Sequence, residues 1–236
     1  MAHPEVLGSL RASRLFGKLA ESQLLVFARS TNREQLQRGE LLWRAGDEPS
    51  AITIITSGLV KICKNLRPGM STIVGLFGPR ESIGDVAVVS GRVYPADAIA
   101  ASDRVELLRV EKKAVLEAME RDSAVAMAVN HSLVEHSAAL QDKIRVLAAG
   151  AVDHRLATLL LHLAERFGDE QEDESTFIPV ALSRAELSLL VGSTIETTIR
   201  IMSRWQKEGL VQTLPEGFVI TRAAALEDVA NDCVGA

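Results

Sequence analysis

One stretch of the chain limits its fold more than any other, because Lys112 to Ala149 contains neither glycine nor proline. Strong helix formers occupy this stretch, most clearly from Leu116 onward, and they predict a long helix. The stretch before it, Leu36 to Val110, is interrupted by glycines at positions 39, 46, 58, 69, 75, 78, 84 and 91. The chain therefore joins a glycine-rich part to a helical part, which indicates the α+β class.

Short β-branched segments lie between these glycines and predict strands. They span residues 51–56, 59–63, 71–74 and 105–110. Many short strands with frequent turns are typical of a sandwich or barrel. No unit of roughly 20 to 50 residues is repeated, so a solenoid is excluded.

An apolar heptad pattern runs along the predicted long helix. Its leucines recur every seven residues, and a helix with such a stripe needs a partner, which a symmetric homodimer supplies. The predicted dimer interface comprises Ala126, Val129, Leu133, His136, Leu140, Ile144 and Leu147. The alternative is that the stripe packs against the β-rich part.

Two short helices separated by Gly192 predict a helix-turn-helix. Ser183 and Glu186 have the spacing of a capping box, which begins a helix that reaches Leu190. A second helix is predicted from Ile195 to Glu208. The second helix of such a motif enters the major groove of DNA.

This motif lies inside a compact C-terminal unit. A helix is predicted over residues 152–167. Residues 210–211 and 218–220, joined by a turn at 215–217, are expected to form a two-stranded wing. The acidic run at 169–174 is predicted to be a solvated loop.

The exposed face of the second helix is predicted to bind DNA. The candidate residues are Ser193, Thr194, Glu196, Thr197, Ile199, Arg200 and Arg204. Arg200 can donate two hydrogen bonds to guanine, and Glu196, four residues earlier on the same face, can accept one from cytosine. The hydroxyl groups suit phosphate oxygens. Alternatively, Glu196 and Arg200 form an ion pair on a solvated helix, or Glu196 closes a second capping box with Ser193.

The net charge of −5 argues weakly against a polyanionic partner. Residues 151–236 hold 7 Lys and Arg against 14 Asp and Glu, whereas residues 183–207 hold four basic residues against two acidic ones. Because the charge of one face matters more than the sum, double-stranded DNA remains the predicted partner.

Other function classes lack their sequence signals. Cys63 and Cys233 are too few for a disulfide framework or a metal cluster and are expected to be free thiols. No apolar run reaches about 20 residues and Met1 to Leu10 lacks a signal-peptide pattern, so a cytoplasmic protein without a membrane partner is expected. No catalytic or nucleotide-binding fingerprint is present, so an enzyme is not predicted.

Motifs spread over nearly the whole chain carry a family resemblance. They are Leu15–Leu19, Arg38–Glu40, Ala45–Asp47, Ile55–Lys61, Phe77–Asp85, Tyr94–Ala98 and Glu196–Arg200. In these the chain resembles the CRP/FNR family of bacterial transcription regulators. The resemblance implies a cyclic-nucleotide-binding-type β jelly roll at 1–115, a dimerisation helix at 116–150 and a winged helix-turn-helix at 151–236. It also implies a pseudo-palindromic site with TGA-like half-sites, and RNA polymerase as a partner.

The resemblance places an effector in the β domain. Its candidate residues are Gly84, Asp85, Arg92, Pro95, Ala96, Leu140 and Gln141. Pro95 and Ala96 stand where the family binds the phosphate of cyclic AMP through an Arg-Ser pair, so cyclic AMP is not expected unless Arg92 is a substitute cation.

The family's other cofactors are an iron–sulfur cluster and haem. Met1 to Ala20 contains no cysteine, so an iron–sulfur cluster is not expected. Haem stays open, with His136 as the first candidate ligand. The effector is therefore unknown. The alternative function is a cyclic-nucleotide-binding or haem-binding sensor module that acts mainly through protein contacts.

Overall fold

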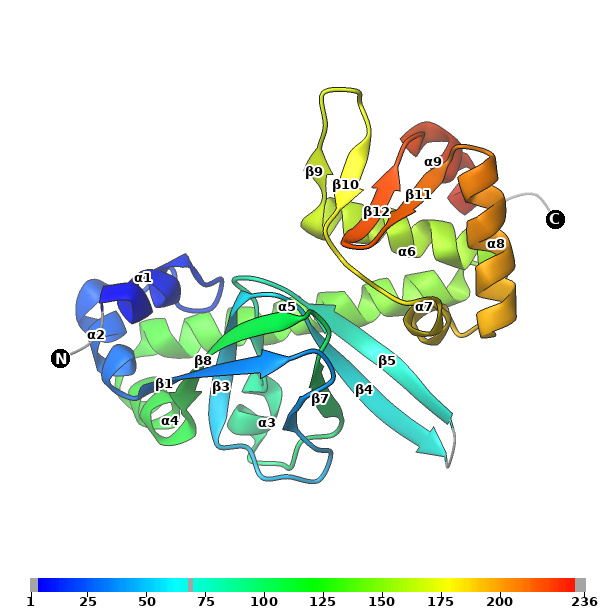
Figure 1. Ribbon diagram of the computed structural model, residues 1–236. Coiled ribbons are helices and arrows are strands. Elements are labelled where there is room, and N and C mark those ends of the chain that lie inside the picture. Colours follow the sequence, from blue (N-terminus) through cyan, green and yellow to red (C-terminus); the bar gives the residue numbers. More distant parts are fainter. Residues whose placement is uncertain (1–3, 68–69, 232–236) are drawn as a thin grey trace. The chain divides into compact units, whose positions relative to one another are not determined.

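The computed structural model describes residues 4–67 and 70–231, which divide into two compact units (Figure 1). The first unit is drawn from residues 1–65 and 75–139, and the second from residues 66–74 and 140–236. The second unit thus takes in the end of one β-hairpin and the C-terminal part of the long helix.

Two four-stranded sheets form the framework of the β-rich part, in the orders β1-β8-β3-β6 and β2-β7-β4-β5. The strands are β1 (Thr31–Gln37), β2 (Leu41–Trp43), β3 (Ala51–Ser57), β4 (Val60–Arg67), β5 (Met70–Phe77), β6 (Ser82–Ile83), β7 (Asp97–Ala100) and β8 (Arg104–Glu111). Each of the four predicted strand segments falls on a strand, namely β3, β4, β5 and β8, although β4 and β5 extend three or four residues beyond their predicted ends. β8 lies between β1 and β3 and is antiparallel to both.

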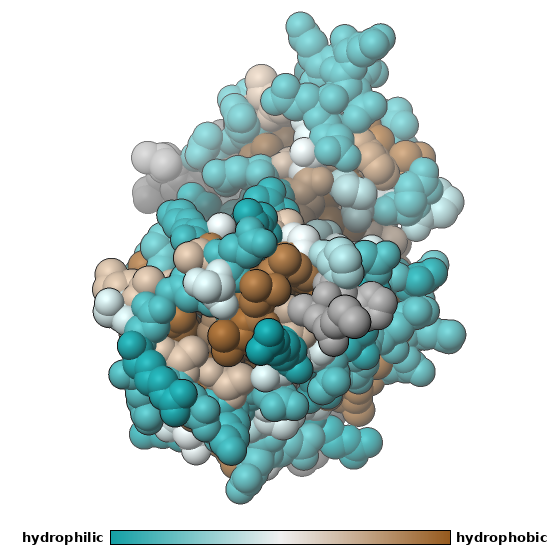
Figure 2. Space-filling view, turned by 90° about the vertical axis from the view of Figure 1, so that its left-hand side faces the viewer, coloured by the Kyte–Doolittle hydropathy of each residue, from teal (hydrophilic) through white to brown (hydrophobic). Residues whose placement is uncertain are grey.

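Four helices accompany these strands, namely α1 (Pro4–Ala12), α2 (Glu21–Arg29), α3 (Asp85–Ser90) and α4 (Lys112–Arg121). One apolar core joins α1, α2, α4 and the start of the long helix to β3 and β8, and in it the rings of Phe16 and Phe27 stack at 4.7 Å. A second core fills the space between the sheets around Trp43, Tyr94 and Leu107. On the side that Figure 2 shows, apolar side chains gather in a patch ringed by hydrophilic ones, and α2 carries the exposed Leu25 and Val26.

The predicted long helix is broken at Asp122, which corrects the expectation of one helix over residues 112–149. α4 ends at Arg121, and α5 (Ser123–Ala148) begins directly afterwards. Asp122 is extended, and its Oδ1 accepts a hydrogen bond from the amide of Ala124 at 2.9 Å. An acidic residue that caps the following helix therefore interrupts a sequence that contains no glycine or proline.

The second unit contains α6 (Val152–Phe167), α7 (Arg184–Val191), α8 (Ile195–Lys207), α9 (Ala223–Asn231) and a four-stranded sheet. The sheet has the order β11-β12-β10-β9, with β9 at Asp169–Glu170, β10 at Thr176–Ile178, β11 at Val211–Leu214 and β12 at Gly217–Ile220. The predicted wing is confirmed as the β11–β12 hairpin. The acidic run was expected to be all loop, but its first two residues form the edge strand β9. Among the described residues, no helix combines the length and the apolar character that a membrane crossing requires.

Candidate nucleic-acid interface and effector site

α7 begins at the predicted capping box. The Ser183 Oγ accepts a hydrogen bond from the Glu186 amide at 3.1 Å, and the Glu186 carboxylate accepts one from the Ser183 amide at 2.9 Å. Gly192, at φ +62°, ends α7 in a left-handed conformation that favours glycine. Leu187 and Val191 of α7 and Ile201 of α8 are buried, so the two helices pack through the apolar positions that their spacing predicts.

We expect Ser183→Ala to lower the free energy of unfolding of the second unit by about 1 kcal/mol, because the Glu186 amide loses its acceptor at the start of α7. The loss can be measured by urea unfolding. Trp205 fluorescence reports this unit in a Trp43→Phe background, since the chain has two tryptophans. Ser203→Ala, an exposed change on α8, is the control and should change stability by less than about 0.5 kcal/mol.

α8 presents its buried and exposed sides as an amphipathic recognition helix requires. Thr194 caps it by accepting a hydrogen bond from the Thr197 amide at 3.2 Å, so a second capping box between Ser193 and Glu196 is ruled out. Ser193 and Thr197 are half-buried at the helix start, next to the exposed Thr194. The hydroxyl groups of Thr194 and Thr197 also bond to each other at 3.1 Å.

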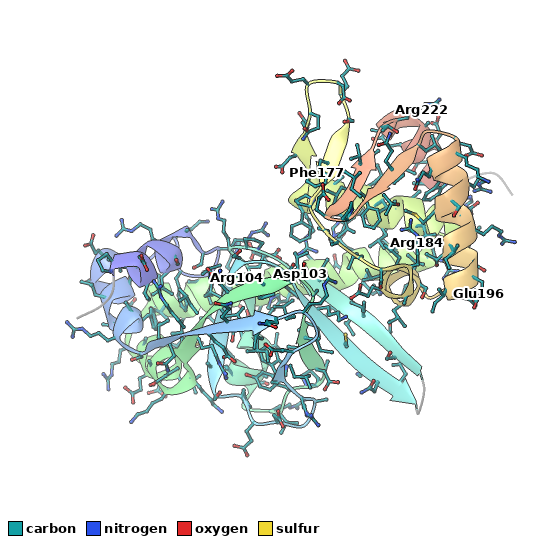
Figure 3. The ribbon with its side chains drawn as sticks, viewed as in Figure 1. Asp103, Arg104, Phe177, Arg184, Glu196 and Arg222 are labelled. Carbon is teal, nitrogen blue, oxygen red and sulfur yellow. The ribbon has the colours of Figure 1, made fainter. Side chains whose placement is uncertain are left out.

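Glu196, Ile199 and Arg200 lie on the exposed side of α8. Figure 3 shows Glu196 at the start of the helix, directed away from the rest of the unit. Within the described residues, neither the Glu196 nor the Arg200 side chain forms a hydrogen bond or ion pair, so the predicted alternative of an ion pair between them is not observed. Both groups are available to a partner. Arg204 differs, because its guanidinium lies 3.3 Å from the Asp153 carboxylate of α6.

The C-terminal carbonyls of α7 are bound by three other elements of the second unit. The Thr72 hydroxyl of β5 donates to the Leu189 carbonyl at 3.2 Å, and the Lys143 ammonium of α5 donates to Leu190. Arg155 of α6 donates to the carbonyls of Val191 at 2.7 Å and Gly192 at 3.2 Å. Cations at a helix C-terminus are favoured by its partial negative charge. These contacts fix the turn that leads into α8.

Sequence reasoning missed this arrangement, since Thr72, Lys143 and Arg155 are far from α7 in the chain. Burial lowers the pKa of Lys143 from 10.5 to about 8. The only sequence signal is the pair of cations near the ends of neighbouring helices, which by itself does not identify their acceptors.

The apolar row that α5 exposes differs from the predicted one. Met127, Val134, Leu140, Ile144 and Leu147 are the exposed large apolar side chains among its described residues, between 44% and 66% exposed.

The predicted dimer-facing residues divide into three groups. Leu140, Ile144 and Leu147 are exposed as expected, and Ala126 and Leu133 are half-buried. Val129 is fully buried in the core of its own unit, so its assignment to a dimer interface is wrong. His136 also turns into its own unit, where its ring binds Asp85.

Asp85 is the centre of a buried polar cluster in the first unit. Its carboxylate is fully buried and accepts hydrogen bonds from the hydroxyls of Ser132 and, at 3.4 Å, Ser82. The Nδ1 atom of His136 lies 3.0 Å from the other carboxylate oxygen. The cluster joins the start of α3 to α5. Of its members, the sequence analysis singled out only Asp85 and His136, and in unrelated roles.

Both ring nitrogens of His136 face acceptors. Nε2 lies 3.0 Å from the Ser82 carbonyl while Nδ1 faces Asp85, and only an imidazolium donates from both nitrogens. Burial by itself would lower the pKa of His136. The hydrogen bond and charge of Asp85, helped by the Ser82 carbonyl and the charge of Glu81, outweigh burial and raise this pKa above 6.5. Neither nitrogen is free to bind haem iron, so His136 is not arranged as a haem ligand.

Comparison with known proteins agrees with both parts of this geometry. Residues 33–122 match the family model of a cyclic nucleotide-binding domain, and residues 154–229 match that of a Crp-like helix-turn-helix domain, so together they cover more than half of the chain. The chain belongs to the CRP/FNR family of transcription regulators.

Individual relatives of this CRP/FNR protein are distant but span most of it. It is 27% identical over 196 residues to a probable transcriptional activator of Rhizobium leguminosarum, covering 83% of this chain and 80% of that one. It is 24% identical over 223 residues to the nitrogen fixation regulation protein FixK of Bradyrhizobium diazoefficiens, covering 94% and 92%. The solved structure of FixK2 from Bradyrhizobium japonicum superimposes with a TM-score of 0.75 at 18% identity, over 84% of this chain and 96% of that one. The predicted fold class is confirmed.

The effector region of this CRP/FNR protein lies around a pair of stacked aromatic side chains. Trp43 and Tyr94 stack at 4.1 Å between the sheets, and a Cβ atom on Gly84 would lie 3.3 Å from the Tyr94 ring. Ala96 is buried, and its carbonyl accepts the indole N–H of Trp43 at 3.0 Å. Neither Pro95 nor Ala96 has a side chain that can donate a hydrogen bond to a phosphate.

The remaining predicted effector residues are not gathered around this point. Arg92 and Pro95 are exposed. Leu140 and Gln141 belong to the second unit and are also exposed. The structure therefore brings together only Gly84, Asp85 and Ala96 of the predicted set, close to buried aromatic and polar side chains.

Proposed function

We propose that this protein is a cytoplasmic, homodimeric regulator that binds a pseudo-palindromic DNA site through α8 and works with RNA polymerase. The observation that carries the proposal is the pair Glu196 and Arg200, one turn apart on the exposed side of α8 and without a partner among residues 4–67 and 70–231. Together they can read a G·C pair in a TGA-like half-site. The transcription regulators to which the chain is related support this function.

The exposed apolar row of α5 supports the homodimer. Leu140, Ile144 and Leu147 leave apolar surface in water, and a second copy of α5 would cover it. Two helix-turn-helix motifs related by a two-fold axis would then engage half-sites about one DNA turn apart. An effector in the first unit would act by changing how the two α5 helices meet, which shifts the population of DNA-competent dimers.

The test is enrichment from a pool of DNA duplexes with a random centre, followed by affinity measurements on the most enriched duplex. Arg200→Ala is expected to weaken binding to that duplex by about 1 to 3 kcal/mol, because a bidentate contact to guanine is lost. Fluorescence anisotropy against a scrambled duplex measures the specificity, and sedimentation of the complex gives the number of chains bound.

Lys207→Ala is the matched control, because it removes one positive charge from the exposed far end of the same helix. This variant should weaken binding to the enriched and the scrambled duplex by the same factor and leave the ratio of the two affinities unchanged. The proposal fails if no duplex is enriched, or if Arg200→Ala leaves this ratio as it was.

A further inference from the structure

His162 of α6 is a buried histidine whose ring forms no hydrogen bond with the described residues. Its side chain is 14% exposed, and its Nδ1 atom is buried. Two carboxylates come close to the ring: Asp142 of α5 lies 3.7 Å from Nε2, and Glu165 of α6 lies 3.9 Å from Nδ1. Hydrogen bonds of nitrogen are about 2.7 to 3.2 Å long, so both distances are too long for one. Buried polar atoms without a partner are uncommon, so this ring requires an explanation.

Three helices of the second unit bring charged groups around this ring. α5, α6 and α9 line a surface cavity of about 660 Å³, and His162 is part of its wall. The charged groups around the ring are Asp142 and Arg145 of α5, Glu165 and Arg166 of α6, and Glu227 of α9. Arg145 binds the Oδ1 atom of Asp142 at 3.1 Å, which leaves Oδ2 facing His162. The ring is thus enclosed by protein on one side and borders a cavity on the other.

These surroundings keep the ring uncharged at neutral pH. Burial, helped by the charges of Arg166 and Arg145, lowers the pKa of His162 below 6.5. The charges of Asp142 and Glu165 act in the opposite direction and offset burial only in part. A proton that binds to the packed ring places a cation where water does not hydrate it. An arrangement in which water reaches the ring through the cavity therefore binds this proton more tightly than the packed one.

The two helices that meet at His162 also hold the turn before α8. α5 supplies Lys143 and α6 supplies Arg155, and both donate hydrogen bonds to the carbonyls at the end of α7. Lys143 directly follows Asp142 in the sequence, and Arg155 lies two turns before His162 on the same helix. Because the two donors belong to different helices, both reach α7 only while α5 and α6 keep their relative position.

We propose that His162 is an acid-sensitive switch on specific DNA binding. When the ring takes up a proton, the arrangement in which it is packed between α6 and α5 loses population to one in which water reaches it. Lys143 and Arg155 then no longer hold the end of α7 together, and the orientation of α8 is less fixed. This inference rests on the proposed DNA binding and adds to it a regulation by pH that requires no bound effector.

The test compares how DNA binding by the full chain depends on pH. Affinity for the most enriched duplex from the random pool is measured between about pH 7.5 and 5.5, for the wild type and for His162→Gln, whose side chain is polar and does not titrate. Relative to this variant, wild-type binding is expected to weaken about three- to tenfold on acidification, since the shift is limited by the ratio of the proton affinities of the two arrangements. His131→Gln is the control, because His131 is 64% exposed, and it should keep the wild-type dependence.

Hydrogen exchange gives a readout that needs no DNA. After correction for the chemical effect of pH, the amides of α6 around His162 should exchange faster at about pH 5.5 than at about pH 7.5 in the wild type. The difference should disappear in His162→Gln and remain in His131→Gln. An NMR titration of the ring should place the pKa of His162 below 6.5, in agreement with its burial.

The outcomes separate this inference from the proposed function. Specific binding with the same pH dependence in the wild type and in His162→Gln overturns the inference and leaves the proposed function standing. Equal protection of α6 at both pH values, or a ring that titrates at or above 6.5, also overturns it. If no duplex is enriched, the proposed function fails and the control of DNA binding by His162 fails with it, whereas the exchange of α6 still shows whether this ring is the acid-sensitive group of the second unit.

Discussion

Replacing His136 by alanine is expected to lower the free energy of unfolding of the first unit by about 3 to 5 kcal/mol at pH 6. Asp85 is fully buried, and the His136 ring is the cation that its carboxylate contacts, at 3.0 Å. Without the ring, the buried Asp85 carboxylate keeps only hydroxyl and amide hydrogen-bond donors. Urea unfolding followed by Trp43 fluorescence, in a Trp205→Phe background, measures the loss in this unit.

His131→Ala is the matched control on the same helix. The His131 side chain is 64% exposed and lies 3.4 Å from the Glu135 carboxylate, so its ion pair is solvated. Such pairs contribute little, and the expected change is below about 0.5 kcal/mol. A loss of similar size for His136→Ala and His131→Ala would mean that the buried cluster does not stabilise the first unit.

The same contact makes stability depend on pH with a definite sign. Because the pKa of His136 is raised above 6.5 in the folded protein, its contribution is fully present below pH 6.5 and is lost as the pH rises through the folded pKa. The advantage of the wild-type protein over His136→Ala should therefore shrink from pH 6 toward alkaline pH.

Asp85→Asn should reverse this dependence. Without the carboxylate, burial becomes the main influence on His136 and lowers its pKa below 6.5. The contribution of His136 then rises with pH up to about 6.5, the ordinary pKa of the imidazole, and is constant above it. Urea curves over a pH series for wild type, His136→Ala and Asp85→Asn check the two signs, and an unchanged slope in Asp85→Asn would contradict the assignment.

The elements with strong local signals were predicted to within a residue. α6 begins and ends as predicted at Val152 and Phe167, and α7 begins at the capping box of Ser183. Such signals depend on residues three or four apart and on backbone conformations that favour glycine, as at Gly192. The pattern on α8 predicted the exposure of Glu196 and Arg200 for the same reason, since helical periodicity determines which side of a packed helix faces outward.

Contacts between distant residues could not be predicted in this way. Asp85 and His136 are 51 positions apart in the sequence, and nothing local to either residue indicates the other. The heptad pattern also left two rows of α5 equivalent. Val129 and Met127 are both apolar, but Val129 faces the core of its unit while Met127 is 65% exposed. Only the position of the neighbouring elements decides which row is free for a partner.

Replacing Arg155 by methionine is expected to lower the free energy of unfolding of the second unit by about 3 kcal/mol, since two charge-assisted hydrogen bonds are lost. Its guanidinium donates to the carbonyls of Val191, the last residue of α7, and of Gly192, which ends that helix. Methionine keeps an unbranched apolar stem in place of the guanidinium, so the change removes the donors with little loss of packing by the stem. Typical domains are stable by about 5 to 15 kcal/mol, so a loss of this size leaves a larger fraction of the second unit unfolded on mild warming. Specific DNA binding by the variant should therefore also weaken on mild warming.

Lys143→Met separates the effect of these donors from a general effect of charge. Lys143 donates to one carbonyl, Leu190, and burial already lowers its pKa to about 8, so a smaller loss is expected than for Arg155→Met.

Between about pH 8 and 10.5 the unfolded chain binds the Lys143 proton more tightly, so the stability of the wild-type unit relative to Lys143→Met should rise with pH there. Urea unfolding followed by Trp205 fluorescence, with the enriched duplex as the readout of binding, measures both variants. If Arg155→Met is no less stable than Lys143→Met, the Arg155 hydrogen bonds do not hold the turn, and the orientation of α8 must depend on the packing of Leu187, Val191 and Ile201 instead.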